Sequence, residues 1–261
     1  MFEIDNILAM LDSEQFPNTY NYLSSLDEDA DDAYEIASTL INLDEPEDFP
    51  TFMIDFITEL YEAAIACGNA QAMNDLGAQY YDGHRGFEQS FNKAMMYYNL
   101  AAQHGNRQAQ ENLGYCYYYG RDGKPDYEKA FHYFALGAFD GHLISLYKIG
   151  DMYLTGKYVD KNEIEAYHIF NRCLQTMTDE AAERVAGPIY LRLGKMYLEG
   201  LGTEKDLKAA QACYQRAEFF LYDMVKNGND MYRRSLESAI EGCEKVREAL
   251  AAELPPKSWA F

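Results

Sequence analysis

The sequence predicts an all-α protein built from a row of stacked helix hairpins. A block of Leu or Ile, Gly, Tyr and Gly recurs about every 36 residues, a period typical of helical repeat proteins. The four copies begin at Leu76, Leu113, Ile149 and Leu193. Within each block the large residue, the Gly and the Tyr fall on one face of an α-helix. A second, Ala-centred segment follows each block, so each copy is expected to form two antiparallel helices.

The first helix of each copy contains a Gly where Ala would give a more stable helix by about 1 kcal/mol. These residues are Gly77, Gly114, Gly150 and Gly194. Their recurrence predicts that the second helix approaches closely at this point, with an Ala of that helix opposite. The facing residues would be Ala94, Ala130, Ala166 and Ala209.

A second Gly in each block is expected to end the first helix and to open a loop rich in Gly, Asp and Lys. These residues are Gly83, Gly120, Gly156 and Gly200. The step from the third to the fourth copy is longer than the others, running from Ile149 to Leu193. We therefore expect an insertion near residue 180 that changes the path of the superhelix.

Upstream, Ile36, Ala37 and Leu40 and the later Tyr61 and Ala64 indicate a degenerate copy, which gives about five hairpins in all. A short amphipathic helix within residues 1–28, ended before Pro17, is expected to cap the amino end. A final helix over residues 231–253 is expected to cover the last hairpin. The predicted domains are an acidic cap and degenerate repeat at 1–70, repeats at 71–106, 107–142, 143–187 and 188–226, and a capping helix and tail at 227–261.

The tail contains Pro255, Pro256, Trp259 and Phe261. Two arrangements remain open for its aromatic side chains. The tail lies along the last helix, or it docks in a groove of its own chain or of a neighbouring chain.

The Leu-Gly-x2-Tyr-x2-Gly and Lys-Ala-x2-Tyr pieces resemble the Sel-one-like repeat family, a relative of the tetratricopeptide repeat. The resemblance covers residues 72 to about 220. It implies a right-handed α-α superhelix, or solenoid, that serves protein–protein interaction. It also implies that the first helices line a concave groove.

Positions about 120° away from the packing stripe on each first helix would then face this groove. Several are Tyr residues that the packing stripe does not require, and Tyr offers a large contact area with a hydroxyl group. Packing between neighbouring repeats is the alternative role for these side chains. The predicted partner-binding residues are Asn74, Tyr81, Glu111, Tyr115, Tyr118, Tyr119, Tyr147, Asp151 and Lys195.

The net charge of −21 is distributed unevenly along the chain. Residues 1–84 contain 19 Asp or Glu and no Lys or Arg, whereas the remainder has 24 acidic and 22 basic residues. An acidic field repels nucleic acids and anionic membranes and speeds encounter with a basic partner. Solubility alone is the other explanation of this charge. We expect no nucleic acid and no membrane among the partners.

Motifs for catalysis, phosphate binding and zinc binding are absent from the sequence. The five Cys are widely spaced, which favours reduced thiols over disulfides or a metal site, and the five His form no ligand pair. The amino end carries acidic residues where a signal peptide would be basic, which predicts a cytoplasmic protein. We expect no enzyme activity, no catalytic residues, no metal and no cofactor.

Two functions remain in competition. The first is an interaction scaffold or adaptor that binds a peptide or protein in the Tyr-rich groove. The second is an acidic inhibitor or immunity protein that neutralises a basic toxin or nuclease. The oligomeric state, monomer or dimer, stays open.

Overall fold

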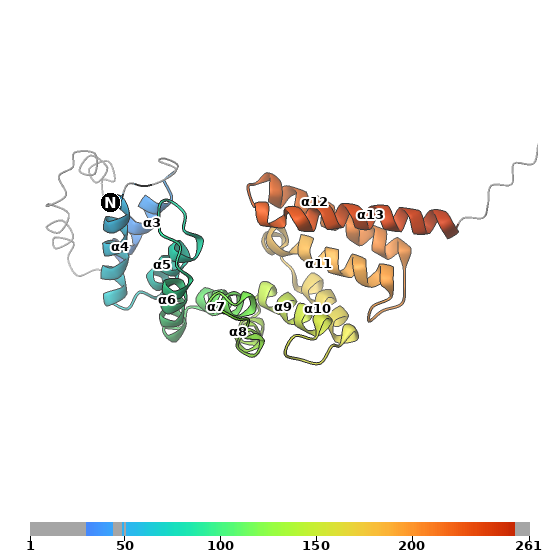
Figure 1. Cartoon of the computed structure of the whole chain (residues 1–261), viewed down its shortest axis with the longest axis horizontal. Coiled ribbons are helices and arrows are strands. Elements are labelled where there is room, and N and C mark those ends of the chain that lie inside the picture. Colours follow the sequence, from blue (N-terminus) through green and yellow to red (C-terminus); the bar gives the residue numbers. More distant parts are fainter. Residues whose placement is uncertain (1–29, 44–48, 50, 254–261) are drawn as a thin grey trace, which may run out of the picture. The chain divides into compact units, whose positions relative to one another are not determined.

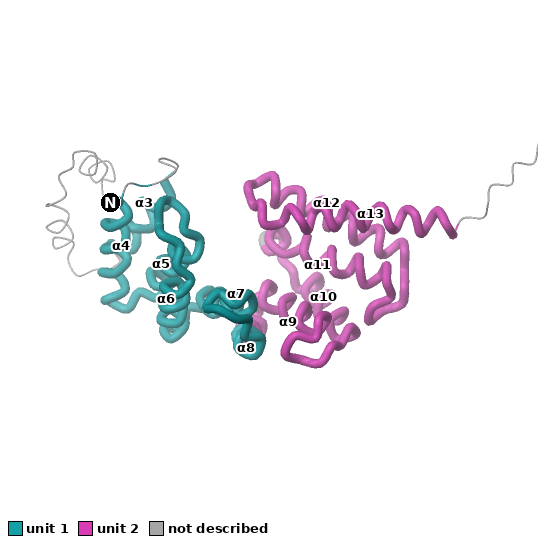
Figure 2. Tube along the Cα trace, in the orientation of Figure 1, with its two compact units in different colours: residues 1–133 teal, residues 134–261 magenta. Residues whose placement is uncertain are grey.

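The computed structural model describes residues 30–43, 49 and 51–253, and these residues form eleven α-helices and one 3-10 helix with no β-strand (Figure 1). The predicted all-α fold of about five hairpins is confirmed. The chain divides into two compact units, residues 1–133 and 134–261, and each is described by itself (Figure 2). The predicted amino-terminal helix and the tail with Trp259 and Phe261 lie outside the described residues.

Unit 1 contains α3 (Ala30–Ile41), α4 (Thr51–Ala66), α5 (Ala70–Asp82), α6 (Phe91–Gln103), α7 (Arg107–Tyr119) and the first part of α8 (Tyr127–Phe139). Helices α3 and α4 pack around a core that includes the fully buried Leu40, Ile57 and Leu60. Ile36 and Ala37, which mark the degenerate copy in the sequence, belong to the same core. Ala72 and Leu76 of α5 also belong to it, so the irregular amino-terminal hairpin shares one apolar core with the next hairpin.

The ends of the first helices follow the predicted chemistry. Gly83, Gly120, Gly156 and Gly200 each adopt the left-handed conformation directly after α5, α7, α9 and α11. Only Gly adopts this conformation without steric cost, so these four positions end their helices. At the other end, the Asn69 and Asn106 side chains accept hydrogen bonds from the first turns of α5 and α7.

The Gly inside a first helix allows close packing of the hairpin, and an aromatic ring of the second helix lies nearest to it. A methyl group at Gly77 would lie 2.8 Å from ring atoms of Tyr98 and 3.2 Å from the Ala94 carbonyl oxygen. At Gly150 and Gly194 the facing side chains are Phe170 and Tyr214. An aromatic ring thus fills the space at Gly77, Gly150 and Gly194. At Gly77 the backbone of the expected Ala94 also lies opposite, and the ring of Tyr98, one turn later, lies nearer.

Unit 2 contains the rest of α8, α9 (Leu143–Thr155), α10 (Glu163–Thr176), α11 (Asp179–Glu199), α12 (Leu207–Lys226), the 3-10 helix η1 (Asp230–Tyr232) and α13 (Arg233–Glu253). The inserted residues near 180 are helical and lengthen α11 to 21 residues, against 13 in α5, α7 and α9. Val185, Ala186 and Ile189 in this extension are buried. Helix α12 is also long, and its Leu221 packs against Gly187.

Helix α13 packs against α12 at the end of unit 2, as the sequence predicted (Figure 1). Val246 of α13 joins Leu207, Ala210 and Tyr214 in a buried cluster. Ala239 joins a second cluster with Leu221. Helix α13 therefore covers apolar side chains of the last hairpin that would otherwise meet water.

Candidate partner-binding surface

The Tyr residues of the packing stripe form pairs inside the hairpins of unit 1. The ring of Tyr80 stacks on Tyr97 with centroids 5.9 Å apart, and Tyr117 stacks on Tyr133 at 5.7 Å. Lys93 and Lys129 lie over the Tyr80 and Tyr117 rings at 4.6 and 4.9 Å. These repeated contacts hold the first helix of each hairpin to its second helix. Packing within the hairpin therefore explains the Tyr residues of the stripe, and no binding partner is needed to explain them.

A different group of aromatic side chains surrounds Arg121, and we call Arg121, Tyr81, Phe91 and Tyr119 the Arg121 cluster. The guanidinium carbon lies 4.7 Å from the Phe91 ring centroid, 5.3 Å from that of Tyr81 and 5.6 Å from that of Tyr119. Arg121 Nε donates a hydrogen bond to the Tyr81 hydroxyl at 3.0 Å. Three rings and one hydrogen bond therefore fix the position of this side chain.

The backbone directs Arg121 toward the preceding hairpin. Gly120 turns the chain at the end of α7, and the Arg121 N–H then donates to the Cys116 carbonyl at 2.9 Å. This is the usual hydrogen bond of a helix closed by a left-handed Gly. Its side chain lies against Tyr81 at the end of α5 and Phe91 at the start of α6.

Further Tyr rings continue from the Arg121 cluster along α7. Tyr119 stacks on Tyr115 at 6.2 Å and meets Tyr118 edge-on at 5.1 Å, and Tyr118 contacts Tyr127 at 5.6 Å. The Tyr119 side chain is 49% exposed. The structure thus brings together four of the predicted partner-binding residues: Tyr81, Tyr115, Tyr118 and Tyr119.

The other predicted residues of unit 1 are buried. Asn74 and Glu111 are each 4% exposed, and the Asn74 side-chain oxygen accepts a hydrogen bond from Asn112 at 3.1 Å. This contact joins α5 to α7, the first helices of successive hairpins. Asn74 therefore has a role between neighbouring repeats.

In unit 2, Tyr147 and Asp151 are buried and Lys195 is exposed. Asp151 accepts hydrogen bonds from both Nε and Nη2 of Arg192, the latter at 2.6 Å. The Arg192 guanidinium also lies 5.3 Å from the Tyr147 ring centroid. This two-point ion pair joins α9 to α11, as Asn112 and Asn74 join α7 to α5.

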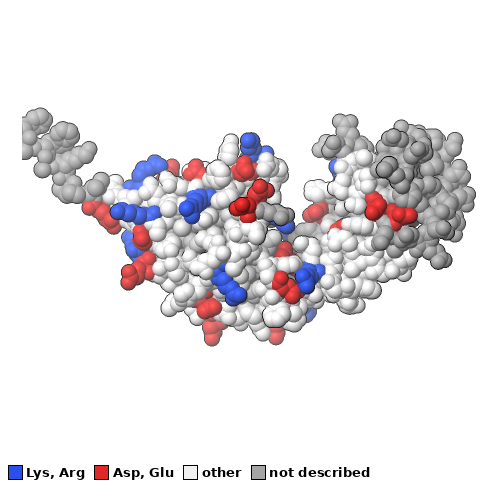
Figure 3. Space-filling model, turned by 180° about the vertical axis from the view of Figure 1, so that it is seen from behind, with Lys and Arg blue, Asp and Glu red and all other residues white. Residues whose placement is uncertain are grey.

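The electrostatics of the two units differ. Residues 1–133 contain 24 acidic residues and 6 Lys or Arg, whereas residues 134–261 contain 19 and 16. On the face of unit 2 shown in Figure 3, cations and anions are interspersed. Within the Arg121 cluster, burial raises the pKa of Tyr81, while the hydrogen bond from Arg121 and its positive charge act in the opposite direction.

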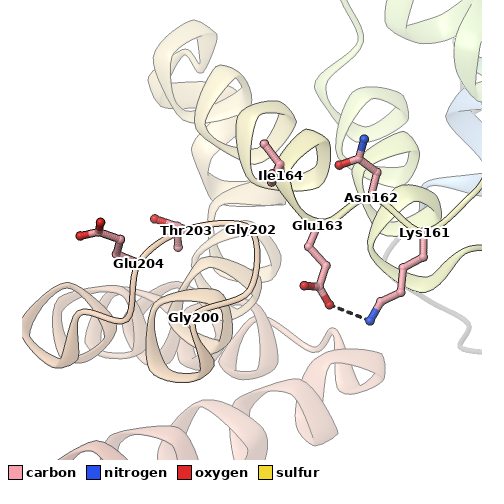
Figure 4. Close-up of a pocket in the computed structure, with 8 residues that line it drawn as sticks. All are labelled: Lys161, Asn162, Glu163, Ile164, Gly200, Gly202, Thr203 and Glu204. Carbon is pink, nitrogen blue, oxygen red and sulfur yellow. Dashed lines mark ion pairs between the residues drawn. The ribbon is translucent and has the colours of Figure 1, made fainter.

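A hollow of about 720 Å³ lies between two loops of unit 2 (Figure 4). Its lining comes from residues 161–164, before and at the start of α10, and from Gly200, Gly202, Thr203 and Glu204 after α11. Lys161 and Glu163 form an ion pair at 2.6 Å, and a side chain at Gly202 would collide with the Glu163 carbonyl oxygen. The close approach of the two backbones explains the Gly at this position.

Among the described residues no three His, Cys, Asp or Glu side chains are grouped so as to hold a metal ion. In the same part of the chain no helix is both long and apolar enough to cross a membrane.

The family model of the Sel1 repeat matches residues 70–106, 107–142, 143–172 and 190–218, which together make up half of the chain. This chain belongs to the Sel1 repeat family. The Sel1 repeat fold is that of a scaffold for protein–protein interaction. Residues 173–189, between two matches, contain the turn after α10 and the extension of α11. The predicted domain boundaries stay predictions.

Solved structures of other repeat proteins are similar to this Sel1 repeat protein. A Sel1 repeat protein from Oxalobacter formigenes is 19% identical, with 98% of each chain covered and a TM-score of 0.63. The protective antigen c5321 of uropathogenic Escherichia coli is 18% identical, with 89% of this chain and 64% of that chain covered and a TM-score of 0.53. At these identities the likeness concerns the fold. No curated protein matches the chain.

Sequence reasoning about this Sel1 repeat protein missed Arg121 and Phe91. Both lie outside the face of the first helix that the resemblance directs to the groove. One signal was available, because Arg121 directly follows the helix-ending Gly120, where a fixed backbone orients the side chain. Its partners are 30 and 40 residues away in the sequence, so the contact depends on how the hairpins stack.

Proposed function

We propose that this Sel1 repeat protein is a non-catalytic adaptor that binds a segment of another protein on unit 1, at the Arg121 cluster and the adjoining Tyr115 and Tyr118. The continuous set of aromatic rings with the half-exposed Tyr119 supports this proposal. Tyr and Arg are enriched among the residues that dominate binding energy at protein interfaces. The rings and the cation are held by one another, so little side-chain entropy remains to be lost on binding.

The proposal is tested by affinity capture from cells that express the tagged full chain. Proteins enriched by the parent chain are compared with those enriched by Tyr119→Ala and by Tyr115→Ala/Tyr119→Ala. We expect a specific partner whose affinity falls at least about tenfold in these variants, as for truncation of an interface hot spot.

The matched control is Tyr222→Ala. Tyr222 is 60% exposed and lies on α12 in unit 2, whereas the residues of the proposed surface belong to unit 1. This variant should keep the partner. If all partners bind the Tyr115 and Tyr119 variants as tightly as the parent, the assignment of this surface is wrong.

A second candidate function is the inhibition of a basic protein, such as a toxin or nuclease. The observation that favours it is the excess of 24 acidic over 6 basic residues in unit 1. Attraction of this origin is screened by salt, so the affinity for such a partner should fall steeply between about 50 and 500 mM NaCl. An affinity that changes little over this range would exclude this function.

A further inference from the structure

Arg121 is a cation that lies among three aromatic rings in the acidic unit 1. Although acidic residues outnumber basic ones four to one in this unit, no carboxylate of the described residues pairs with the Arg121 guanidinium. Its recorded side-chain contacts are the Tyr81 hydroxyl and the rings of Tyr81, Phe91 and Tyr119. Only Nε is used as a donor, and Arg121 is itself exposed.

A guanidinium in this arrangement is prepared for a carboxylate. Arg presents its donors in a planar fork that matches the two oxygens of a carboxylate, and the pair is frequently two-pronged. Nε donates to the Tyr81 hydroxyl, so the terminal nitrogens are the donors that remain for an acceptor. Because the side chain is already fixed by the rings, the entropy cost of holding it in place has been met on folding.

We propose that Arg121 binds the carboxylate of an Asp or Glu side chain in the partner segment, and that Tyr119 packs against an apolar or aromatic residue beside it. The inference rests on the proposed function and names the chemistry that this surface recognises. The acidic field of unit 1 opposes each further negative charge, so the segment carries this carboxylate in an otherwise neutral or basic sequence. The same field disfavours phosphate groups and nucleic acids.

The test uses the full chain and a bead library of random peptides with acetylated amino ends and amidated carboxyl ends. In this library side chains are the only source of carboxylates. We expect the selected peptides to share one Asp or Glu next to an apolar or aromatic residue. The peptide is then resynthesised with Gln for Glu, or Asn for Asp, and its affinity is measured for the parent chain and for Arg121→Gln.

For the parent chain, neutralising the peptide carboxylate should lower the affinity about tenfold, as expected for the loss of a charge-assisted hydrogen bond. For Arg121→Gln the two peptides should bind equally. The matched control is Arg216→Gln, because Arg216 also donates to a Tyr hydroxyl, that of Tyr190 at 3.0 Å, but lies on α12. This variant should distinguish the two peptides as the parent does, and circular dichroism checks that each variant is folded.

The other outcomes separate this inference from the proposed function. Peptides that lack a carboxylate but lose affinity with Tyr119→Ala would overturn the role of Arg121 and keep the binding surface. Basic peptides that bind Arg121→Gln more tightly than the parent would show that Arg121 merely occupies a cage for a partner's cation, and would also overturn the inference. If no peptide depends on Tyr119 or Arg121, both proposals are wrong.

Discussion

Gly77 shows how one residue controls the spacing of a hairpin. Replacement of Gly by Ala inside a helix ordinarily stabilises it by about 1 kcal/mol. Here the added methyl group would collide with the Tyr98 ring at 2.8 Å. We expect Gly77→Ala to lower the free energy of unfolding by about 1–2 kcal/mol, because the cost of overpacking exceeds the gain in helix propensity. Urea denaturation measures the difference.

The collision with Tyr98 can be separated from other causes by a double-mutant cycle. Tyr98→Leu leaves room for a methyl group, so Gly77→Ala should cost less in that background than in the parent. Equal costs in both backgrounds would show that the ring is not the cause.

The cysteines allow burial to be tested residue by residue. Cys116 and Cys173 are fully buried, and burial raises the pKa of each thiol to about 12, whereas Cys67 is exposed. Since the thiolate is the reactive form, iodoacetamide at about pH 8 should label Cys67 and leave Cys116 and Cys173 unmodified until the chain unfolds. Peptide mapping by mass spectrometry identifies the labelled sites. Rapid labelling of Cys116 in the native protein would contradict this burial.

At the residue scale, the sequence located four rings of the candidate surface but not the cation among them. Tyr81, Tyr115, Tyr118 and Tyr119 stood out because the packing stripe does not require them. Arg121 had no such signal, since its contacts with α5 and α6 depend on tertiary structure. Asn74 and Asp151 have helical positions that the resemblance directed to a groove, but their short polar side chains pair with the next first helix.

Asn106 connects two elements as well as capping one. Its side-chain oxygen accepts from the Ala109 N–H, and its Nδ2 donates to the Ala70 carbonyl oxygen at 3.2 Å. We expect Asn106→Ala to lower the free energy of unfolding by about 2 kcal/mol, because the cap and the link to α5 are both lost. Thermal or urea denaturation measures this change.

Asn162 provides the matched control. It caps α10 through the Glu165 N–H, and none of its recorded side-chain hydrogen bonds reaches another helix. Asn162→Ala should therefore cost about 1 kcal/mol. If the two substitutions cost the same, the bond between α7 and α5 contributes nothing to stability.

At the element scale, the helix-ending Gly residues and the insertion near residue 180 were predictable, but the helical form of the insertion was not. The left-handed backbone conformation that ends each first helix is adopted without steric cost only by Gly. The position of this Gly in the sequence therefore predicts where the helix ends. The residues near 180 fit no regular copy of the repeat, and α11 contains Pro188, a residue type that usually interrupts a helix. Helix α11 nevertheless continues past Pro188, because burial of Val185 and Ile189 stabilises this part of the helix. The Pro188 carbonyl oxygen accepts a hydrogen bond from Arg192 Nη1 at 2.8 Å.

At the scale of the whole molecule, we expect a destabilising substitution to affect mainly the hairpin that contains it and the neighbouring hairpins. In a solenoid each repeat is stabilised mainly by the repeats beside it. Gly77→Ala should therefore speed amide hydrogen exchange in α5 and α6 and leave exchange in α12 and α13 unchanged. Mass-spectrometric exchange under native conditions measures both regions. Equal acceleration in all helices would show that the chain opens as one cooperative body.

The repeat pattern was enough to predict the fold class, because each copy carries the same large residue, Gly and Tyr at helical spacing. The division into two units at residue 133 could not be read in the same way. This boundary falls inside α8, whose sequence fits the repeat as well as α6 does. The position of such a boundary depends on the side-chain contacts between neighbouring hairpins. The residues that recur in every copy do not specify these contacts.

The rings opposite Gly77, Gly150 and Gly194 each come from the same hairpin as the Gly. Each of these hairpins therefore contains both residues of the contact that packs its two helices together. Duplication or loss of one in-frame copy in the gene would preserve this contact. Only the polar contacts between successive first helices, such as that of Asn112 with Asn74, would have to form again. Proteins of this design can thus change length by whole copies. The number of copies encoded in the gene then sets the length of the surface that is available to a partner.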